Sequence, residues 1–356
     1  MIKFAIAGMG IRGNLFSRII SQHRDTQLVA VCDIRNEIAN KTSKMYNVKG
    51  YTDWGHLLDQ EEVDAAYIAT PDDAHRGPAV LAAERGLNLL IEKPLATSMT
   101  DCIAINEAVQ KAGVKGSVVF HNRWNPSFIR AKEAIDSGEL GKIISLNVRA
   151  NDTLYVPTQM LRWASRSSPA WFLLSHAFDL ALWLTGAKAH SIFAKGIKSK
   201  LVGMGIDTYD LIHTMIEFSD GVIGLFETTW VLPDSMPSLV DVGWEIIGDE
   251  GAFYVNQQEQ MVRKATQEKF SFPMTISDID IHGIASGREF FVFESFINSI
   301  RKNSKPVVTI EETIEVTRII EGLHPFYQRE KTSSPRKMST MVEVGVDTYS
   351  GGNDGV

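Results

Sequence analysis

Two segments of this chain carry side chains whose types suit proton transfer. Lys93 stands between Glu92 and Pro94 after an apolar run, so we expect it at the end of a buried strand, where a partly desolvated amine can accept a proton. His176 and Asp179 lie three residues apart in an apolar segment predicted to be helical, and therefore share one helix face. A histidine there can exchange a proton with a reacting oxygen, while the carboxylate fixes its tautomer or binds substrate. The local pattern also fits two structural alternatives, a surface ion pair of Glu92 with Lys93 and a core histidine satisfied by an internal carboxylate.

A glycine motif near the N-terminus predicts a dinucleotide site. Gly8, Gly10 and Gly13, with Ile11 and Arg12 between the last two, form G-x-G-x-x-G between a predicted strand and a predicted helix. The first glycine permits a tight turn, the second lets a pyrophosphate approach the backbone, and the third lets the helix pack on the strand. The phosphate charge then meets free N–H groups at the start of the helix.

The acid that follows the motif indicates which dinucleotide binds. Asp33 ends the second predicted strand, where its carboxylate can accept hydrogen bonds from both adenosine ribose hydroxyls. Because a carboxylate repels a 2'-phosphate, NAD is favoured over NADP, although Arg35 stands near enough to pair with that phosphate. The alternative is a glycine-rich turn followed by a solvated aspartate, and the agreement of strand, turn, helix and acid argues against it.

The elements that must position these residues follow the pattern of a doubly wound α/β domain. Apolar runs alternate with helical patterns, giving strands at 3–7, 27–32, 65–69, 88–91 and 117–120 and helices at 14–22, 36–46, 76–85 and 100–112. Ligands bind at the carboxyl ends of such strands. Thr70 and Pro71 after one strand, and Glu92 and Lys93 after the next, are therefore expected at the nicotinamide.

Beyond Pro126 the pattern changes to an antiparallel sheet in a second domain. Strands are predicted at 142–150, 190–197, 208–218, 221–230, 239–248 and 251–256, and helices at 127–137, 169–184, 289–301 and 311–323, the last two closing this domain. The stretch from Lys331 is rich in Ser, Thr, Pro and Gly. We therefore predict a Rossmann domain at 1–120, an α+β domain at 121–330 and a tail at 331–356.

Composition narrows the class of partner. The formal charge of −7 is spread along the chain, with no basic stripe for nucleic acid and no polybasic arm for a membrane. Cys32 and Cys102 form no metal or redox spacing, and nine histidines without a compact cluster do not argue for a metal. We expect a cytoplasmic protein with a small-molecule ligand, no nucleic acid, no membrane and no metal.

Taken together, these motifs resemble the glucose-fructose oxidoreductase/inositol dehydrogenase (Gfo/Idh/MocA) family. The resemblance rests on 7–13, 69–75, 92–94, Arg123 before Pro126, 138–141 and 175–179, and it spans roughly residues 1 to 325 in the family's order. It implies a Rossmann domain followed by an α+β domain whose open sheet often forms the interface of a homo-oligomer, here a dimer or tetramer. It implies Lys93 and His176 as the catalytic pair. Pro71, His75 and Glu92 would shape the nicotinamide pocket, and Asn122, Arg123, Phe172 and Asp179 would line the substrate site.

The chain departs from the family pattern at one position. Usual dehydrogenase members carry an aspartate four residues before the histidine, and here that residue is Phe172. If Phe172 faces the cleft, its ring gives the substrate an apolar wall in place of a hydrogen-bond acceptor. If it turns into the core, another acid takes over, with Asp207 or Asp210 the nearest candidates in sequence.

Three classes of function fit this sequence. The leading one is an NAD-dependent dehydrogenase of a sugar, sugar acid or cyclitol hydroxyl, with Lys93 and His176 as acid and base. The second is a redox-assisted glycosidase or lyase in which tightly held NAD is regenerated in each turnover. The third is a non-enzymatic NAD-binding regulator, against which the presence of both Lys93 and His176 argues.

Overall fold

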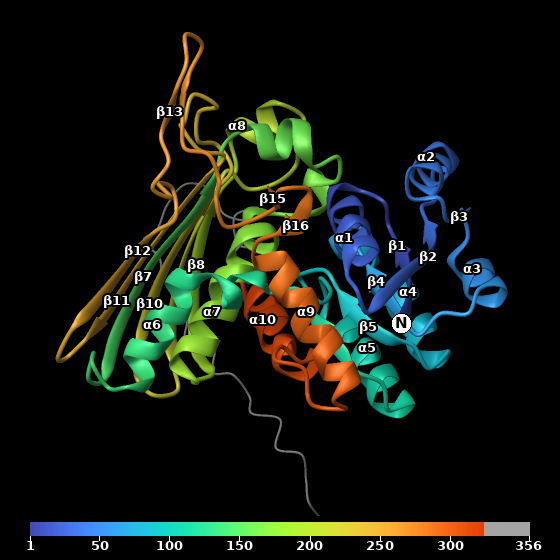
Figure 1. Ribbon diagram of the computed structural model, residues 1–356. Coiled ribbons are helices and arrows are strands. Elements are labelled where there is room, and N and C mark those ends of the chain that lie inside the picture. The colour runs from blue at the N-terminus through green and yellow to red at the C-terminus, as the bar shows by residue number, and fades with distance from the viewer. Residues whose placement is uncertain (324–356) are drawn as a thin grey trace, which may run out of the picture.

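A six-stranded parallel sheet forms the N-terminal half of the protein (Figure 1). The structure is a computed structural model that describes residues 1–323, so the predicted tail at 331–356 lies outside the described residues. The strands are β1 (Ile2–Ala7), β2 (Thr26–Cys32), β3 (Lys49–Tyr51), β4 (Ala65–Ile68), β5 (Asn88–Ile91) and β6 (Gly116–Val118). Their order is β3-β2-β1-β4-β5-β6 with every pair parallel, the arrangement of a Rossmann domain.

Helices cover both faces of this sheet because the side chains of its strands enter two hydrophobic cores, one on each face. The helices are α1 (Ile11–Gln22), α2 (Asn36–Tyr46), α3 (Trp54–Gln60), α4 (Arg76–Glu84) and α5 (Met99–Ala112). Phe4 and Ile6 of β1 face α1, whereas Ala66 and Ile68 of β4 belong to the core under α4 and α5. The predicted elements are confirmed within a few residues, but β3 and α3 were not predicted because both are very short.

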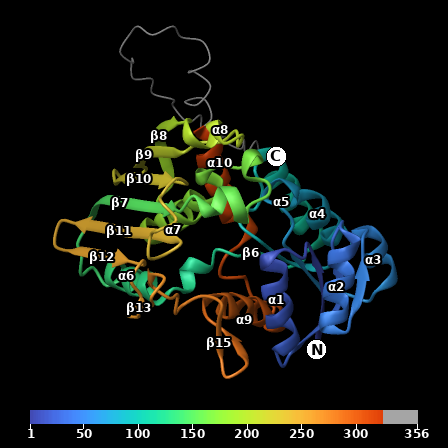
Figure 2. The same cartoon turned by 90° about the horizontal axis from the view of Figure 1, so that it is seen from above.

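The second sheet is mostly antiparallel and is covered by helices on one face (Figure 2). It contains β7 (Ile143–Asp152), β8 (Ala189–Ile197), β9 (Leu211–Phe218), β10 (Ile223–Thr229), β11 (Val240–Gly248) and β12 (Ala252–Asn256). The order is β12-β11-β7-β10-β9-β8, and only the β10–β7 pair is parallel. The helices α6 (Pro126–Asp136) and α7 (Ser175–Thr185) lie on the inner face. This confirms the predicted fold class.

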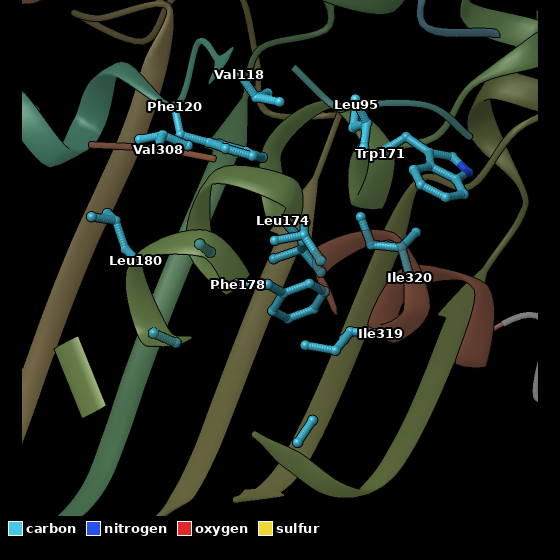
Figure 3. Packing of buried hydrophobic residues seen from close by; sticks show 14 of the residues in the cluster. Leu95, Val118, Phe120, Trp171, Leu174, Phe178, Leu180, Val308, Ile319 and Ile320 are labelled. Atoms are coloured by element: carbon cyan, nitrogen blue, oxygen red, sulfur yellow. The ribbon is translucent and has the colours of Figure 1, made fainter. Parts of the chain in front are cut away.

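The two C-terminal helices connect the halves of the protein. In Figure 3, Leu174 of η5 (Ala170–Leu174) and Phe178 of α7 pack with Ile319 and Ile320 of α10 (Ile310–Gly322). The helix α9 (Arg288–Arg301) instead packs against the Rossmann sheet, where Phe293 lies 5.3 Å from Phe4 between ring centroids. The expectation that both helices close the second domain is therefore wrong for α9.

Short elements complete the described part of the chain. They are η1 (Asp72–Ala74), η2 (His121–Trp124), η3 (Val156–Met160), η4 (Ala164–Arg166), η5 (Ala170–Leu174), α8 (Lys200–Gly203) and the hairpin strands β13 (Lys264–Ala265), β14 (Phe270–Ser271), β15 (Ile279–Ile281) and β16 (Ile284–Ser286). The segments η3 and η5 are wide π-type turns, which often occur next to functional sites. Within residues 1–323 no helix is long and apolar enough to span a bilayer.

Candidate active site

The glycine turn has the conformation that a bound dinucleotide requires. Gly8 adopts φ = +93°, and a Cβ atom there would lie 2.4 Å from the carbonyl oxygen of Ala69. A Cβ atom on Gly13 would lie 2.0 Å from the Gly8 oxygen, so this position also admits only glycine. A Cβ atom on Gly10, by contrast, would meet no other atom within 4 Å. This open space next to the uncapped first turn of α1 fits a pyrophosphate.

Asp33 is held beside this turn by backbone amides. Its Oδ2 accepts the Met9 N–H at 3.0 Å, and its Oδ1 accepts the Arg35 backbone N–H at 3.0 Å and the Arg35 Nε–H at 3.2 Å. Asp33 is buried, whereas the Arg35 side chain is 43% exposed. The Asp33 carboxylate is therefore fixed beside the glycine turn, and the Arg35 guanidinium is its charged neighbour.

The loop after β4 is fastened to the loop after β5 by His75. This side chain is 1% exposed, with Nδ1 at 2.9 Å from the Pro94 oxygen and Nε2 at 3.1 Å from the Thr70 oxygen. Each ring nitrogen lies within hydrogen-bonding distance of a backbone carbonyl, and the tautomer decides which of the two carbonyls accepts the ring N–H. His75 therefore lies between Thr70 and the Lys93-Pro94 turn and links the two loops.

Glu92 points into the protein and pairs with Arg12 of the glycine motif. The Arg12 Nε–H donates to Glu92 Oε1 at 2.7 Å, and the Tyr67 hydroxyl donates to the same oxygen. Glu92 is 5% exposed, so a surface ion pair with Lys93 is excluded. Arg12 also lies 3.5 Å from Glu289 of α9. Arg12 thus links α1, the end of β5 and α9. Its positive charge lowers the pKa values of Lys93 and His176.

Lys93 lies at the centre of the site, held by the backbone of the π-type turn η5. Its Nζ donates to the carbonyl oxygen of Phe172 at 2.8 Å and lies 4.3 Å from the centroid of the Phe172 ring. Burial lowers the pKa of Lys93 below its usual 10.5, and the Asp72 and Glu92 carboxylates oppose this shift. A lysine with a lowered pKa can exchange a proton nearer to neutral pH.

His176 lies on α7, near Lys93 of the Rossmann domain. Its ring lies 4.7 Å from the His121 ring between centroids, and its buried Nδ1 has no hydrogen-bond partner within residues 1–323. Burial lowers the pKa of His176 well below 6.5, and the positive charges of Lys93, Arg288 and Arg12 lower it further. The imidazole is therefore neutral at physiological pH and has a nitrogen that can accept a proton.

Among residues 1–323 the Asp179 carboxylate forms no hydrogen bond with His176, so the predicted orientation of the histidine by this carboxylate is wrong. Asp179 forms a two-point pair with Arg123, with Nε–Oδ2 at 3.0 Å and Nη2–Oδ1 at 2.7 Å. Arg123 also donates to Glu312 of α10 at 2.6 Å. Burial raises the pKa of Asp179 to about 6, and the guanidinium opposes the shift. Arg123 and Asp179 therefore link η2, α7 and α10. These hydrogen bonds do not support the predicted contacts of the two side chains with a substrate.

Phe172 partly fits each of the two predicted alternatives, an apolar wall of the cleft and a residue of the core. Its ring lies under the Lys93 amine, as expected for a residue in the pocket, and it also packs edge to face against Trp230, with ring centroids 6.0 Å apart. The two acids proposed to replace an aspartate here lie elsewhere. Asp210 accepts the backbone N–H groups of Lys200 and Leu201 at 2.7 and 2.9 Å, and Asp207, whose side chain is 80% exposed, pairs with Lys198.

Sequence reasoning missed three charged side chains around this pair. Asp72 follows Pro71 directly, which was a usable signal, and its charge acts on Lys93. Asp152 lies two residues beyond the predicted end of its strand, and its charge also reaches Lys93. Arg288 begins α9 and donates to Asn122 Oδ1 at 2.5 Å, which occupies the predicted substrate ligand Asn122. No local pattern brings α9 to this site.

No group of three metal-ligating side chains occurs among residues 1–323. An open hollow does lie over the outer face of the second sheet, lined by residues such as Phe193, Met215 and Leu225. Neither Lys93 nor His176 lines it, so it is separate from the site that contains these two residues.

Comparisons with known proteins agree with this geometry. Residues 2–120 match a family described as an oxidoreductase family with an NAD-binding Rossmann fold, and residues 128–254 match the Gfo/Idh/MocA C-terminal domain. The chain is 27% identical to scyllo-inositol 2-dehydrogenase (NAD(+)) of Bacillus subtilis, over 91% of this chain and 94% of that protein. It is 24% identical to myo-inositol 2-dehydrogenase of Thermotoga maritima, over 75% and 79% of the two chains. The crystal structure of scyllo-inositol dehydrogenase from Lactobacillus casei with NAD(H) and scyllo-inositol shares the fold, with a TM-score of 0.79, 18% identity and 93% and 98% of the chains covered. The chain therefore belongs to the Gfo/Idh/MocA family of oxidoreductases.

Proposed function

We propose that this protein is an NAD-dependent dehydrogenase that oxidises a secondary hydroxyl of a cyclitol, sugar or sugar acid. The observation that carries the proposal is the meeting of Lys93 and His176 next to the glycine turn. The two side chains come from β5 of the Rossmann domain and α7 of the second domain, and they are close enough for the Lys93 charge to lower the pKa of His176. The named relatives act on inositols, which supports a substrate of this chemical class.

The residues of this chain would handle the proton. NAD, when bound, supplies the acceptor for the hydride that leaves the carbinol carbon. The neutral His176 imidazole can take the hydroxyl proton on its free Nδ1, since no other group in the described part of the chain occupies that nitrogen. Lys93 would hold the reacting oxygen through its remaining N–H groups, because one is already bound to the Phe172 carbonyl.

The dinucleotide would lie along the row of groups described above. The open space at Gly10 and the amides of α1 suit the pyrophosphate, and Asp33 suits the adenosine ribose. Thr70 and Pro71 would line the nicotinamide, with Glu92 and Arg12 holding the strand ends behind them.

The test is a screen of scyllo-inositol, myo-inositol, glucose and glucuronate with NAD, followed by near-ultraviolet absorbance of NADH. Net NADH with at least one of them supports the proposal, and Lys93→Met provides the inactive control. Conversion of a substrate without net NADH would support the redox-assisted lyase class instead. Tight NAD binding with no conversion in a broad screen would favour a regulatory protein.

We also propose that two or four copies associate through the outer face of the second sheet. Phe193, Met215 and Leu225 are cross-strand neighbours on β8, β9 and β10, and each is more than 40% exposed. A row of apolar side chains on an uncovered sheet face is unusual for a surface that stays in water. Light scattering should give a smaller particle for Leu225→Asp than for the wild type, and an unchanged one for Val307→Asp, whose exposed side chain lies outside this sheet.

A further inference from the structure

The inner face of β7 ends in a carboxyl group at a position where the strand pattern calls for an apolar residue. Successive side chains of a strand point to opposite faces, so Leu146, Val148, Ala150 and Asp152 share one face. The first three are buried in hydrophobic clusters. Asp152 continues this row and is 1% exposed. A carboxyl group in such a place needs a reason, because burial of an unpaired acid is costly.

Within residues 1–323, Asp152 has no partner that would explain it as a part of the scaffold. Its Oδ2 accepts no hydrogen bond there and is shielded from solvent. The Trp230 indole lies beside it and lowers its pKa as a donor would, but the Trp230 Nε1 atom also lacks a partner at hydrogen-bonding distance. Asp210, an equally buried aspartate of the same domain, differs in that its two oxygens accept backbone N–H groups. Of these two buried aspartates, Asp152 is therefore the one whose carboxyl group lacks backbone hydrogen bonds.

The charged group that Asp152 faces is Lys93. Among the described residues, Lys93 is the ionisable side chain whose charge acts on Asp152, and Asp152 in turn raises the pKa of Lys93. No ion pair within 4.0 Å joins the two in the described part of the chain. A chain of ring contacts leads from the Lys93 amine to the neighbourhood of Asp152: the amine lies over the Phe172 ring, and this ring contacts the Trp230 ring beside Asp152.

We propose that Asp152 takes the place of the aspartate that position 172 lacks, as the positioning acid of the second domain that sets the charge of Lys93. The inference rests on the proposed function, because it concerns the charge of the lysine that holds the reacting oxygen in that function. Asp72 acts on Lys93 from the Rossmann side, but it already accepts a hydrogen bond from Ser167 at 3.4 Å. In this chain the acid therefore lies on β7, whereas position 172 lies on η5.

The titration of Lys93 is the direct readout of this role. Besides Asp152, the charged and titratable groups acting on or affected by Lys93 are Asp72 of η1, Glu92 after β5, Arg12 of α1, His121 of η2 and His176 of α7. Once Asp152 is ionised, above about pH 8, its negative charge stabilises the protonated amine. Its removal should therefore move the Lys93 titration to lower pH, by about one pH unit, the low end of the range for an opposite charge within roughly 6 Å.

The experiment is competitive labelling of Lys93 with acetic anhydride across pH, read by mass spectrometry with the other lysines as internal standards. It uses the full chain without substrate, so it does not depend on which compound is oxidised. Asp152→Asn and Asp152→Leu should both lower the labelling midpoint, and Leu continues the apolar row if Asn impairs folding. Asp210→Asn is the matched control and should leave the midpoint where it is in the wild type.

The pH profile of kcat/KM with the best compound of the screen then tests the same shift in turnover. The limb that reports the Lys93 titration should move to lower pH by the same amount in Asp152→Asn. An unchanged labelling midpoint in folded Asp152 variants would overturn the inference, even if the wild type is an active dehydrogenase. A shifted midpoint in a protein that oxidises none of the compounds would support it while refuting the proposed function.

Discussion

Replacement of Asp152 by asparagine should stabilise the fold, and the gain should grow with pH. Burial raises the pKa of Asp152 from its ordinary 3.8 to about 8. Below about pH 4 the carboxyl is protonated in both the folded and the unfolded chain, so it has no effect on their balance. Between these two pKa values the unfolded chain releases the proton and the folded chain retains it. The free energy of unfolding of the wild type therefore falls as pH rises through this window, and asparagine abolishes that loss.

The size of the effect follows from the shift. One pKa unit corresponds to about 1.36 kcal/mol, so a shift of about four units sets an upper limit near 5 to 6 kcal/mol at pH 8. Two costs reduce it. The asparagine amide is itself a buried polar group, at about 1 to 3 kcal/mol, and Lys93 loses one of the carboxyl groups that favour its charge. We expect a net gain of about 1 to 3 kcal/mol at pH 8 and no gain near pH 4.

Thermal unfolding at several pH values between about 4 and 8 measures this difference. The matched variant Asp210→Asn should lose stability instead, by about 1 to 2 kcal/mol, because its carboxylate accepts two backbone N–H groups. A wild type that is more stable than Asp152→Asn at pH 8, or a difference that does not grow with pH, would refute the reasoning. Such a result would mean that Asp152 stabilises the fold and has a structural role.

Three other changes test the rest of the site. Asp33→Ser should weaken NAD binding and reduce the preference for NAD over NADP in cofactor titrations, since it removes the acid proposed to bind the ribose and repel a 2'-phosphate. An unchanged preference would mean that Asp33 does not contact the adenosine ribose. Lys93→Met should lower turnover by about a hundred- to ten-thousand-fold while NAD affinity and melting temperature stay near the wild-type values, and a folded variant with most of its rate would disprove the assignment. Phe172→Ala should change substrate preference and cost about 1 to 3 kcal/mol of stability, less than a fully buried ring, because Phe172 is only partly buried; a large drop in melting temperature with unchanged specificity would place its role in the core.

The parts of the site that local sequence determines could be predicted. The positive φ of Gly8 and the close contact of Gly13 belong to a turn whose residues are adjacent in the chain. Likewise, Asp33 and Lys93 lie at strand ends that the apolar runs mark directly. Parallel strands bring such ends to one edge, so their meeting follows from the fold class alone.

The pairing of charged side chains could not be predicted, because it depends on packing between distant elements. Arg12 turns inward since Glu92 and Glu289 lie behind the glycine turn, and Glu289 comes from a helix far along the chain. Asp179 pairs with Arg123, although the helical spacing alone favoured His176. Asp152 was missed for a third reason: its strand runs two residues further than the apolar pattern, so a polar residue at the strand end still lies in the core.

Phe172 also explains why an acid on another element is needed. The residue still stabilises the Lys93 ammonium, through its backbone carbonyl at 2.8 Å and through the face of its ring. Neither the carbonyl nor the ring gains or loses a proton. Neither can therefore make the charge of Lys93 depend on the protonation of a second group. A carboxyl group can do so, and the two that act on Lys93 from beyond its own strand are Asp72 in the Rossmann domain and Asp152 in the second domain. Because Asp152 is fixed to β7 and not to the helix that carries His176, the charge of Lys93 depends on how the sheet packs against η5.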